Sequence, residues 1–378
     1  MKALRVFALI SLCSLGAAVF SRAQQGPNSK GSETVARPRK PGAAAPATEP
    51  DRPKIPSKFP KKDGELPEGV PTFTADVLTI SVDAAVLDSR GNFIPKIPRG
   101  NFRILEDNVP QQVSGFSVGE APMTIAMVIE FSNRYQQFYS EPWYQTLTAA
   151  YGFLQTLKPE DYVAIVAYDI KPEILSDFST DRQAANEAMQ RLRIAGFSES
   201  KLYDAVVDTA QRMQDIEGRK AIVLISSGVD TFSKLTFDKA RRGLQDAGVP
   251  IYAVGLMQAI REFYDAAGYL GSIQRLDFLQ ADNQMRTFAK ETGGMSFFPR
   301  FYGEFPGIFR AISEAMRNEY VLTYNPSNQN RDGKFRKIKV ELVNPETNEP
   351  LRVVDEKGKP IKYQITAKAG YTAPRKVE

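Results

Sequence analysis

The hydrophobic pattern of the chain changes twice, and each change predicts a different class of structure. Between Thr124 and Ile129 the chain is almost entirely apolar, which predicts a strand covered on both faces. Similar runs start near Asp161, Ala221 and Ile251, and amphipathic stretches separate them. Strands that alternate with helices of about 10 to 15 residues predict right-handed crossovers, and therefore an α/β fold with a doubly wound, mostly parallel sheet.

The amphipathic stretches give the positions of the expected helices. They lie at residues 181–194, 202–216, 237–247, 283–292 and 305–317, and the expected strands after the first lie at 161–168, 221–226 and 251–256. A long connection, residues 258–275, follows the last of these strands. Loops of that length in a compact domain are often functional.

Both sides of this central segment follow a period of two instead. The alternating stretches are residues 73–86, 102–106 and 112–118 before it, and 320–324, 335–343, 351–354 and 361–367 after it. Alternation of this kind predicts antiparallel strands. Neither flank has enough strands for a sandwich alone, so we expect residues 71–121 and 319–378 to pair into one β-sandwich, with residues 122–318 inserted as the α/β domain. Two separate strand bundles remain the alternative.

The first residues have the features of a secretory signal peptide. Lys2 and Arg5 precede an apolar stretch that ends at Phe20, and small residues then lead to Ala23. We expect cleavage after Ala23, so that residues 1–23 are removed and the protein is secreted or periplasmic. The alternative is an uncleaved anchor, but the apolar stretch is short beside the roughly 20 residues that a membrane span needs. No transmembrane segment is expected after cleavage.

The segment from residue 24 to residue 70 is rich in Pro, Lys, Ala and Gly, which predicts a disordered linker. It contains nine basic and six acidic residues, and the signal peptide adds three basic ones. The formal net charge of the whole chain is +5, so residues 71–378 carry a net charge of −1. The basic composition therefore gives no support for nucleic-acid binding.

Composition excludes most catalytic chemistry. The chain has no histidine, which removes Ser-His-Asp catalysis, Cys-His catalysis and the commonest zinc ligand. Its single cysteine, Cys13, lies in the predicted signal peptide, and no phosphate-binding glycine motif is present. We therefore expect a protein that is not an enzyme.

Polar residues follow the first buried strand and mark a candidate site. The apolar run stops at Glu130, and Ser132, Asn133 and Arg134 come next. Ligands of open α/β sheets bind just outside the carboxyl ends of the strands. Aromatic residues crowd the chain that follows, among them Tyr135 and Trp143, and such residues often anchor protein interfaces.

Several motifs, in this order, resemble a known family. They are T-I-A-M-V-I-E-F-S from residue 124, S-K-L-Y-D-A-V from residue 200, A-I-V-L-I-S-S-G-V-D-T from residue 221 and I-Y-A-V-G-L from residue 251. Together they resemble the von Willebrand factor type A domain, and more closely the secreted proteins with this domain that are abundant in acidobacteria. The resemblance, over about 300 residues, implies the α/β fold and a secreted location.

The family's usual chemistry is a metal-ion-dependent adhesion site, in which hydroxyls and carboxylates from three loops hold Mg²⁺. The resemblance places five residues of this chain at the family's ligand positions. Where the family has Asp, Ser, Ser, Thr and Asp, this chain has Glu130, Ser132, Arg134, Ser200 and Ser227, in that order. Three of these residues oppose cation binding: Glu130 has a longer carboxylate, Arg134 adds a guanidinium group, and Ser227 lacks a carboxylate. We therefore expect no cofactor, and we expect an ion pair between Arg134 and Glu130 in place of the ion. An Arg134 side chain that points into solvent is the alternative.

Two functions follow from these observations. The first is a secreted binding or scaffolding module with a degenerate adhesion site, which recognises a protein or cell-envelope ligand through Glu130, Ser132, Asn133, Arg134, Ser200, Ser227, Tyr135 and Trp143. The second is a metal-dependent adhesion protein that still holds Mg²⁺ or another divalent cation weakly. Its candidate ligands are Glu130, Ser132 and Ser200, with Asp230 in place of the carboxylate lost at Ser227.

Overall fold

In a computed structural model of the protein, the apolar run after residue 122 forms β5 (Met123–Glu130), whose residues are all buried. Its side chains alternate between two hydrophobic clusters, with Met123, Ile125, Met127 and Ile129 in one, and Ala126 and Val128 in the other. Because both faces are covered, the side chains from Ile125 to Ile129 are all apolar, and the polar residues Thr124 and Glu130 lie near the two ends. Polar chemistry is therefore confined to its two ends.

The structure describes residues 78–89, 91–118, 122–132, 140–192, 199–258, 261, 272–354 and 358–375. All of these belong to one compact unit, Pro53–Glu378. The predicted signal peptide and linker lie outside the described residues and stay predictions. No helix of the described part is both long and apolar enough to cross a membrane.

β5 lies within a six-stranded sheet of order β10-β9-β8-β5-β6-β7. The other strands are β6 (Tyr162–Tyr168), β7 (Pro172–Ser179), β8 (Arg219–Ser226), β9 (Ile251–Gly255) and β10 (Ser296–Phe297). Neighbours pair in parallel, except that β7 is antiparallel to β6. The α/β fold and the mainly parallel sheet agree with the sequence prediction, whereas β7 was not predicted.

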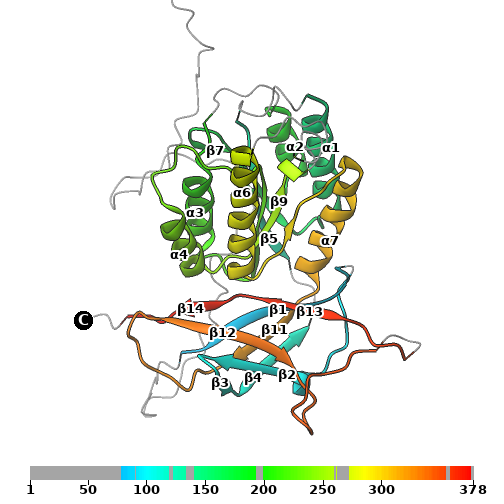
Figure 1. Ribbon diagram of the computed structural model, residues 1–378, viewed down its shortest axis with the longest axis vertical. Coiled ribbons are helices and arrows are strands. Elements are labelled where there is room, and N and C mark those ends of the chain that lie inside the picture. The colour runs from blue at the N-terminus through cyan, green and yellow to red at the C-terminus, as the bar shows by residue number, and fades with distance from the viewer. Residues whose placement is uncertain are drawn as a thin grey trace, which may run out of the picture. The chain divides into compact units, whose positions relative to one another are not determined.

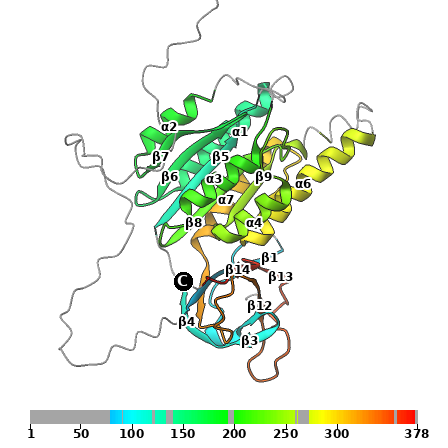
Figure 2. The same cartoon turned by 90° about the vertical axis from the view of Figure 1, so that its left-hand side faces the viewer.

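Helices cover both faces of this sheet (Figures 1 and 2). Side chains from α1 (Ser140–Thr156), α2 (Arg182–Gln190) and α7 (Phe305–Arg317) share one cluster with β5. Side chains from α3 (Leu202–Met213), α4 (Phe237–Ala247) and α6 (Ser272–Thr292) share the other. Alternating apolar positions on the strands thus match an amphipathic face on each helix.

The helix ends follow local capping chemistry. Asp181 caps α2 by accepting hydrogen bonds from the backbone N–H groups of Gln183 (2.9 Å) and Ala184 (3.3 Å). Thr236 caps α4, which ends at Gly248 in a left-handed conformation. The predicted bounds of α4 and α7 are confirmed, but α6 starts about three turns earlier than predicted. The connection expected over residues 258–275 is therefore shorter, and its residues 259–260 and 262–271 lie outside the described ones.

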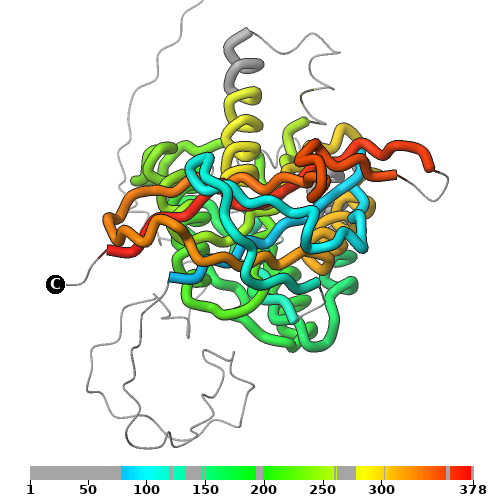
Figure 3. The backbone as a smooth tube through the Cα atoms, turned by 90° about the horizontal axis from the view of Figure 1, so that it is seen from below, coloured from blue at the N-terminus to red at the C-terminus, as the bar shows by residue number. Residues whose placement is uncertain are grey.

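The flanks form two four-stranded sheets, and each contains strands from both sides of the α/β part. The first flanking sheet has the order β13-β1-β11-β4 and the second has the order β14-β12-β2-β3. Figure 3 shows the N-terminal strands in blue and cyan among the C-terminal strands in orange and red. The bounds are β1 (Ile80–Asp88), β2 (Phe102–Glu106), β3 (Val109–Gln111), β4 (Val113–Val118), β11 (Tyr320–Tyr324), β12 (Phe335–Leu342), β13 (Tyr363–Ala367) and β14 (Gly370–Thr372), with short 3-10 helices at Arg99–Asn101 and Tyr302–Glu304.

The two flanking sheets share one hydrophobic cluster. Val82 of β1, Ile104 of β2, Leu322 of β11 and Val340 of β12 all contribute to it. Tyr320 places its hydroxyl in this cluster, donating to the carbonyl of Ile94 (2.8 Å) and accepting from the N–H of Ile97 (3.0 Å). The stretch predicted as a strand over residues 351–354 forms only isolated bridges, at Pro350 and Val354.

Asp161 joins the two points at which the chain enters and leaves the α/β part. Its carboxylate is fully buried and accepts hydrogen bonds from the N–H groups of Met123 (3.0 Å) and Lys158 (2.7 Å). It also forms an ion pair with Arg317 (2.8 Å), at the end of α7. Asp161 therefore fixes the start of β5 beside the end of α7.

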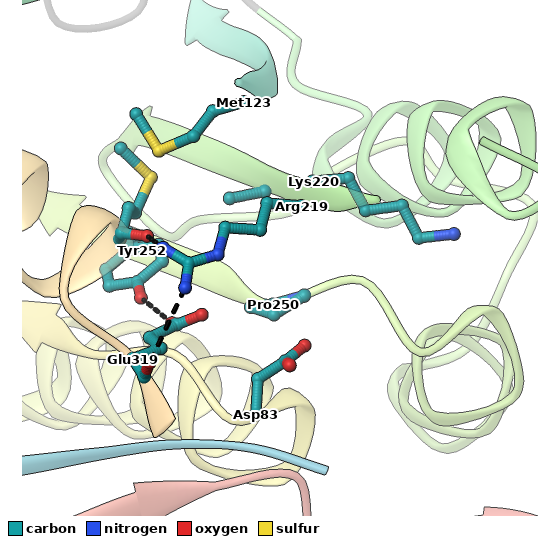
Figure 4. A pocket seen from close by; sticks show the side chains of 9 residues that line it. Asp83, Met123, Arg219, Lys220, Pro250, Tyr252 and Glu319 are labelled. Atoms are coloured by element: carbon teal, nitrogen blue, oxygen red, sulfur yellow. Dashed lines mark hydrogen bonds between the residues drawn. The ribbon is translucent and has the colours of Figure 1, made fainter. Parts of the chain in front are cut away.

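A second polar cluster lies beside this junction (Figure 4). Glu319, just before β11, is 8% exposed and accepts a hydrogen bond from the Tyr252 hydroxyl (3.2 Å). Arg219 donates to the backbone carbonyls of Arg317 (2.5 Å) and Glu319 (3.4 Å). Burial, together with the nearby carboxylate of Asp83, raises the pKa of Glu319 to about 8.

We predict that Asp161→Ala destabilises the fold by about 3 to 5 kcal/mol, because Arg317 then keeps a largely buried charge without its partner. Urea denaturation measures this loss. The matched control is Asp177→Ala, whose exposed carboxylate lies 3.6 Å from Arg212 and whose loss should cost less than about 1 kcal/mol. Equal losses in the two variants would contradict a structural role for Asp161.

We predict that Glu319 makes the free energy of unfolding depend on pH. The pKa of Glu319 rises from 4.5 to about 8 in the folded protein, so the folded state holds a proton that the unfolded state releases. Stability should therefore fall as pH rises from about 5 to about 8, by about 4 kcal/mol at most. Glu319→Gln keeps an acceptor for Tyr252 and should remove this part of the slope. Parallel pH profiles of the two proteins, measured by urea denaturation, would refute the prediction.

Candidate functional site

The parallel register brings three polar side chains together at one end of the sheet. Glu130 is the last residue of β5, and its partner on β6 is Tyr168, the last residue of that strand. On the other side, Ile129 pairs with Ile225, so Ser226 at the end of β8 lies next to Glu130. Tyr168, Glu130 and Ser226 are all buried.

The Glu130 carboxylate is enclosed by hydrogen-bond donors. Its Oε2 atom accepts from the Ser227 N–H (2.7 Å), the Ser227 hydroxyl (2.8 Å) and the Ser226 hydroxyl (2.9 Å), and the Tyr168 hydroxyl lies 3.5 Å away. Its Oε1 atom accepts from the Ser132 hydroxyl (2.9 Å). Donors from the protein thus surround both oxygens of the carboxylate.

A chain of hydrogen bonds extends this network. The Tyr168 hydroxyl lies 2.7 Å from the Ser226 hydroxyl, which also accepts from the Gly228 N–H (2.8 Å). Burial, followed by the negative charge of Glu130, raises the pKa of Tyr168 well above its usual value, so its hydroxyl stays protonated. Gly228 has φ +78°, and a Cβ there would lie 2.9 Å from the Ala281 carbonyl oxygen. Only glycine fits this turn.

Ser200 is held against the β8–α4 loop (residues 227–236). Its N–H donates to the Thr231 hydroxyl (2.8 Å), and its carbonyl accepts from the N–H groups of Thr231 (2.9 Å) and Phe232 (3.0 Å). The Ser200 hydroxyl is buried, and no hydrogen-bond partner for it occurs among the described residues. It therefore differs from the serine hydroxyls around Glu130, which are all engaged.

Asp230 faces the start of α3. Its carboxylate accepts from the Tyr203 N–H (3.2 Å) and the Ser233 hydroxyl (2.5 Å), and Ser233 accepts from the Asp204 N–H (3.2 Å). Burial raises the pKa of Asp230, and burial with the charge of Asp230 raises the pKa of Tyr203 to about 12. Asp230 and Ser233 thus cap a helix that has no side-chain cap of its own.

Asp204 lies in the first turn of α3 and also binds the β8–α4 loop. Its carboxylate accepts from the N–H groups of Lys234 (3.0 Å) and Leu235 (3.1 Å), at the far end of the β8–α4 loop. The loop is therefore fixed at both ends and in the middle, because Glu130, Ser200 and α3 each bind a different part of it.

The described residues offer little to a metal ion. No three Asp, Glu or Cys side chains gather closely enough there to hold one. Glu130, Ser132 and Ser227 are brought together, but they bind one another. The carboxylate of Asp230 is engaged at α3, so only the Ser200 hydroxyl is an unused oxygen among the candidate ligands that the structure describes.

The remaining predicted residues are less informative. Asn133, Arg134 and Tyr135 lie outside the described residues, so the expected ion pair of Arg134 with Glu130 stays a prediction. Trp143 lies in α1, at a position whose side chain the structure does not describe.

The sequence analysis missed four residues of this region. Tyr168 and Ser226 end two buried strands, and lining up the polar ends of neighbouring strands would have found them. Phe232 is 54% exposed, and the ammonium group of Lys201 lies 5.2 Å from the centre of its ring. An aromatic residue in a loop with several small and polar residues was the available signal.

A family model described as von Willebrand factor type A domain matches residues 130–229. No curated protein matches the sequence.

Several solved structures are similar to this chain. An aerotolerance-related membrane protein from Bacteroides fragilis NCTC 9343 shares 14% identity at a TM-score of 0.38, over 51% of this chain and 98% of that one. The vWF domain of the type V pili tip protein Mfa5 from Porphyromonas gingivalis shares 14% identity at a TM-score of 0.40, over 52% of this chain and 95% of that one. A von Willebrand factor type A protein from Catenulispora acidiphila shares 11% identity at a TM-score of 0.40, over 79% of this chain and 76% of that one.

Similarity of structure at this level says nothing of function. The family match begins at Glu130 and ends within the β8–α4 loop, so it covers the residues that build the hydrogen-bond network. The chain contains a von Willebrand factor type A domain.

Proposed function

We propose that the protein is a non-enzymatic binding or scaffolding module, and that its metal-ion-dependent adhesion site is degenerate. The observation that carries this proposal is the enclosed carboxylate of Glu130, whose two oxygens accept hydrogen bonds from Ser132, Ser226 and Ser227. A cation at this point would have to displace short bonds from protein donors. Each such bond to a buried charge contributes about 1.5 to 3 kcal/mol.

This network replaces what a bound ion does for the fold. In a site of the usual kind, the ion ties the end of the first strand to two other loops. Here Glu130 ties the end of β5 directly to the β8–α4 loop, and Ser200 ties the same loop to the start of α3. The β8–α4 loop is therefore held at several points by protein groups alone, which suits a preformed binding surface.

Phe232 is an exposed aromatic residue of this surface, and the ammonium group of Lys201 lies against its ring. The ring of Phe232 is exposed on a loop whose backbone is held by Ser200. Rigid aromatic residues bury large areas at small entropic cost, and they are common at the centres of protein interfaces. We propose a protein or cell-envelope ligand that contacts Phe232, with the predicted Asn133, Arg134, Tyr135 and Trp143 as further contacts.

The alternative function is metal-dependent adhesion through a weakly bound cation. The buried Ser200 hydroxyl favours it, because buried polar groups without a partner are rare and often mark an absent ligand. In that case Ser200 would join Glu130, Ser132 and Asp230 around the ion, and the hydrogen bonds of Glu130 would have to open.

We further propose that the flanking sheets form one β-sandwich interrupted by the α/β domain, and that the protein is secreted or periplasmic. The first proposal is supported by the cluster that both sheets share, and the second by the signal-peptide pattern of residues 1–23.

We predict that excess Mg²⁺ or Mn²⁺ leaves the melting temperature of the protein unchanged relative to chelator. A ligand that binds only the folded state must raise the melting temperature, whereas an enclosed Glu130 leaves no site for it. Differential scanning fluorimetry measures this. A metal-dependent rise that Glu130→Ala abolishes would establish the alternative function and refute the degenerate site.

We predict that Phe232→Ala reduces capture of the partner by about tenfold or more, as expected for an aromatic residue at the centre of an interface. The measurement is affinity capture from envelope extract, with and without chelator. The control is Val109→Ala, which removes an exposed apolar side chain from the second flanking sheet (51% exposed). If both variants capture the same partners as the unaltered protein, the β8–α4 loop is not the binding surface.

A further inference from the structure

A groove of about 790 Å³ lies where α6 meets the flanking sheets, and its lining residues are far in sequence from Glu130. Figure 1 shows one end of α6, in yellow, above β12 and β13. Its lining comes from α6, the stretch at β10, and one edge each of β12 and β13. Residues that matter for its chemistry are Arg286, Lys290, Met295, Val340, Ile365 and Ala367.

β13 presents an open strand edge to this groove. It is the last strand of its sheet, and among the described residues it pairs only with β1. The carbonyl of Val86 on β1 accepts a hydrogen bond from the N–H of Ile94, which lies on the side of β1 away from β13. The backbone groups of Val86 therefore point away from its partner Ile365, and this pair is not hydrogen-bonded. Ile365 and, by alternation, Ala367 therefore direct their backbone N–H and C=O groups away from β1, and both residues line the groove.

β12 presents a second open edge. β14 covers only its first residues, Phe335 to Lys337. On the same side, the Ile338 N–H donates to the carbonyl of Ala369 (2.8 Å), and the Leu342 carbonyl accepts from Leu351 (3.0 Å). Val340 lies between Ile338 and Leu342 and directs its backbone N–H and C=O to the same side of β12. No backbone partner for these two groups occurs among the described residues. Unpaired edges of this kind are templates for an added strand.

The walls of the groove are cationic. Arg286 and Lys290 are exposed on α6, and the guanidinium of Arg286 lies 4.0 Å from the centre of the Phe298 ring. Glu291 is an acidic residue of the lining, but Arg241 (3.0 Å) and Gln245 (2.9 Å) hold its carboxylate. Four cationic side chains, Arg286, Lys290, Lys339 and Lys368, thus face one acidic residue, Glu291, in the described lining.

We propose that this groove binds an extended acidic peptide of a partner protein as an added β-strand. The peptide's backbone pairs with the open edge of β13 at Ile365. Its acidic side chains face Arg286 and Lys290. Backbone pairing supplies affinity and the charges supply selectivity, as in other proteins that bind peptides by strand addition. This site is independent of the one at Glu130.

The test uses the full protein and two labelled peptides, one that alternates valine with aspartate and one that alternates valine with lysine. Fluorescence anisotropy should show binding of the acidic peptide alone. Ile365→Pro removes an outward N–H without touching the β1 pairing, and should weaken binding by about tenfold or more. Its control, Val118→Pro, alters the corresponding outward position on β4, the other open edge of the same sheet, and should leave binding unchanged.

Charge is tested by Arg286→Glu combined with Lys290→Glu, which should abolish binding of the acidic peptide and admit the basic one. Arg310→Glu, an exposed charge reversal on α7, is the control and should have no effect. Thermal denaturation verifies that each variant is folded. Failure of the acidic peptide to bind, equal binding of both peptides, or equal effects of Ile365→Pro and Val118→Pro would overturn the proposal. So would a dimer, seen by light scattering, that Ile365→Pro dissociates, because the groove would then hold a second copy of the chain.

Discussion

The structure depends on the burial of β5 on both faces. Between Ile125 and Ile129 every side chain of this strand is apolar, because neither covered face offers water to a polar group. Its polar contacts therefore occur at its two ends, and each end fixes a different part of the molecule. At its start, the N–H of Met123 binds Asp161 and so joins the chain entry to α7. At its end, Glu130 binds the loop that follows β8.

Much of the α/β fold could be predicted because its signals are local. The buried strands are short apolar runs, and α4 and α7 carry clear amphipathic periods and end signals. β7 was missed because its side chains are only partly buried, it begins with Pro172, and its pairing with β6 shifts register. The early start of α6 was missed because its first turns have no strong apolar period.

The candidate site could be predicted only in part. Glu130 was found because it interrupts an apolar run, Ser132 because it follows that run, and Ser227 through the family resemblance. Tyr168 and Ser226 were not found, because each looks like the last residue of an ordinary strand. What gives them a role is the register of β6, β5 and β8, which places three strand ends side by side. Register depends on contacts between distant segments, and no local pattern encodes it.

The pairing of β4 with β11 has a mechanical consequence. Val118, at the end of β4, is the direct partner of Tyr320, at the start of β11. The chain therefore leaves the flanking sheets and returns to them, roughly 200 residues later, at the same place. Tension applied to the segments before β1 and after β14 would therefore load the strand pairs of the flanks first. The α/β part would stay unstretched until that pair separated, so the proposed binding surface would keep its shape under force.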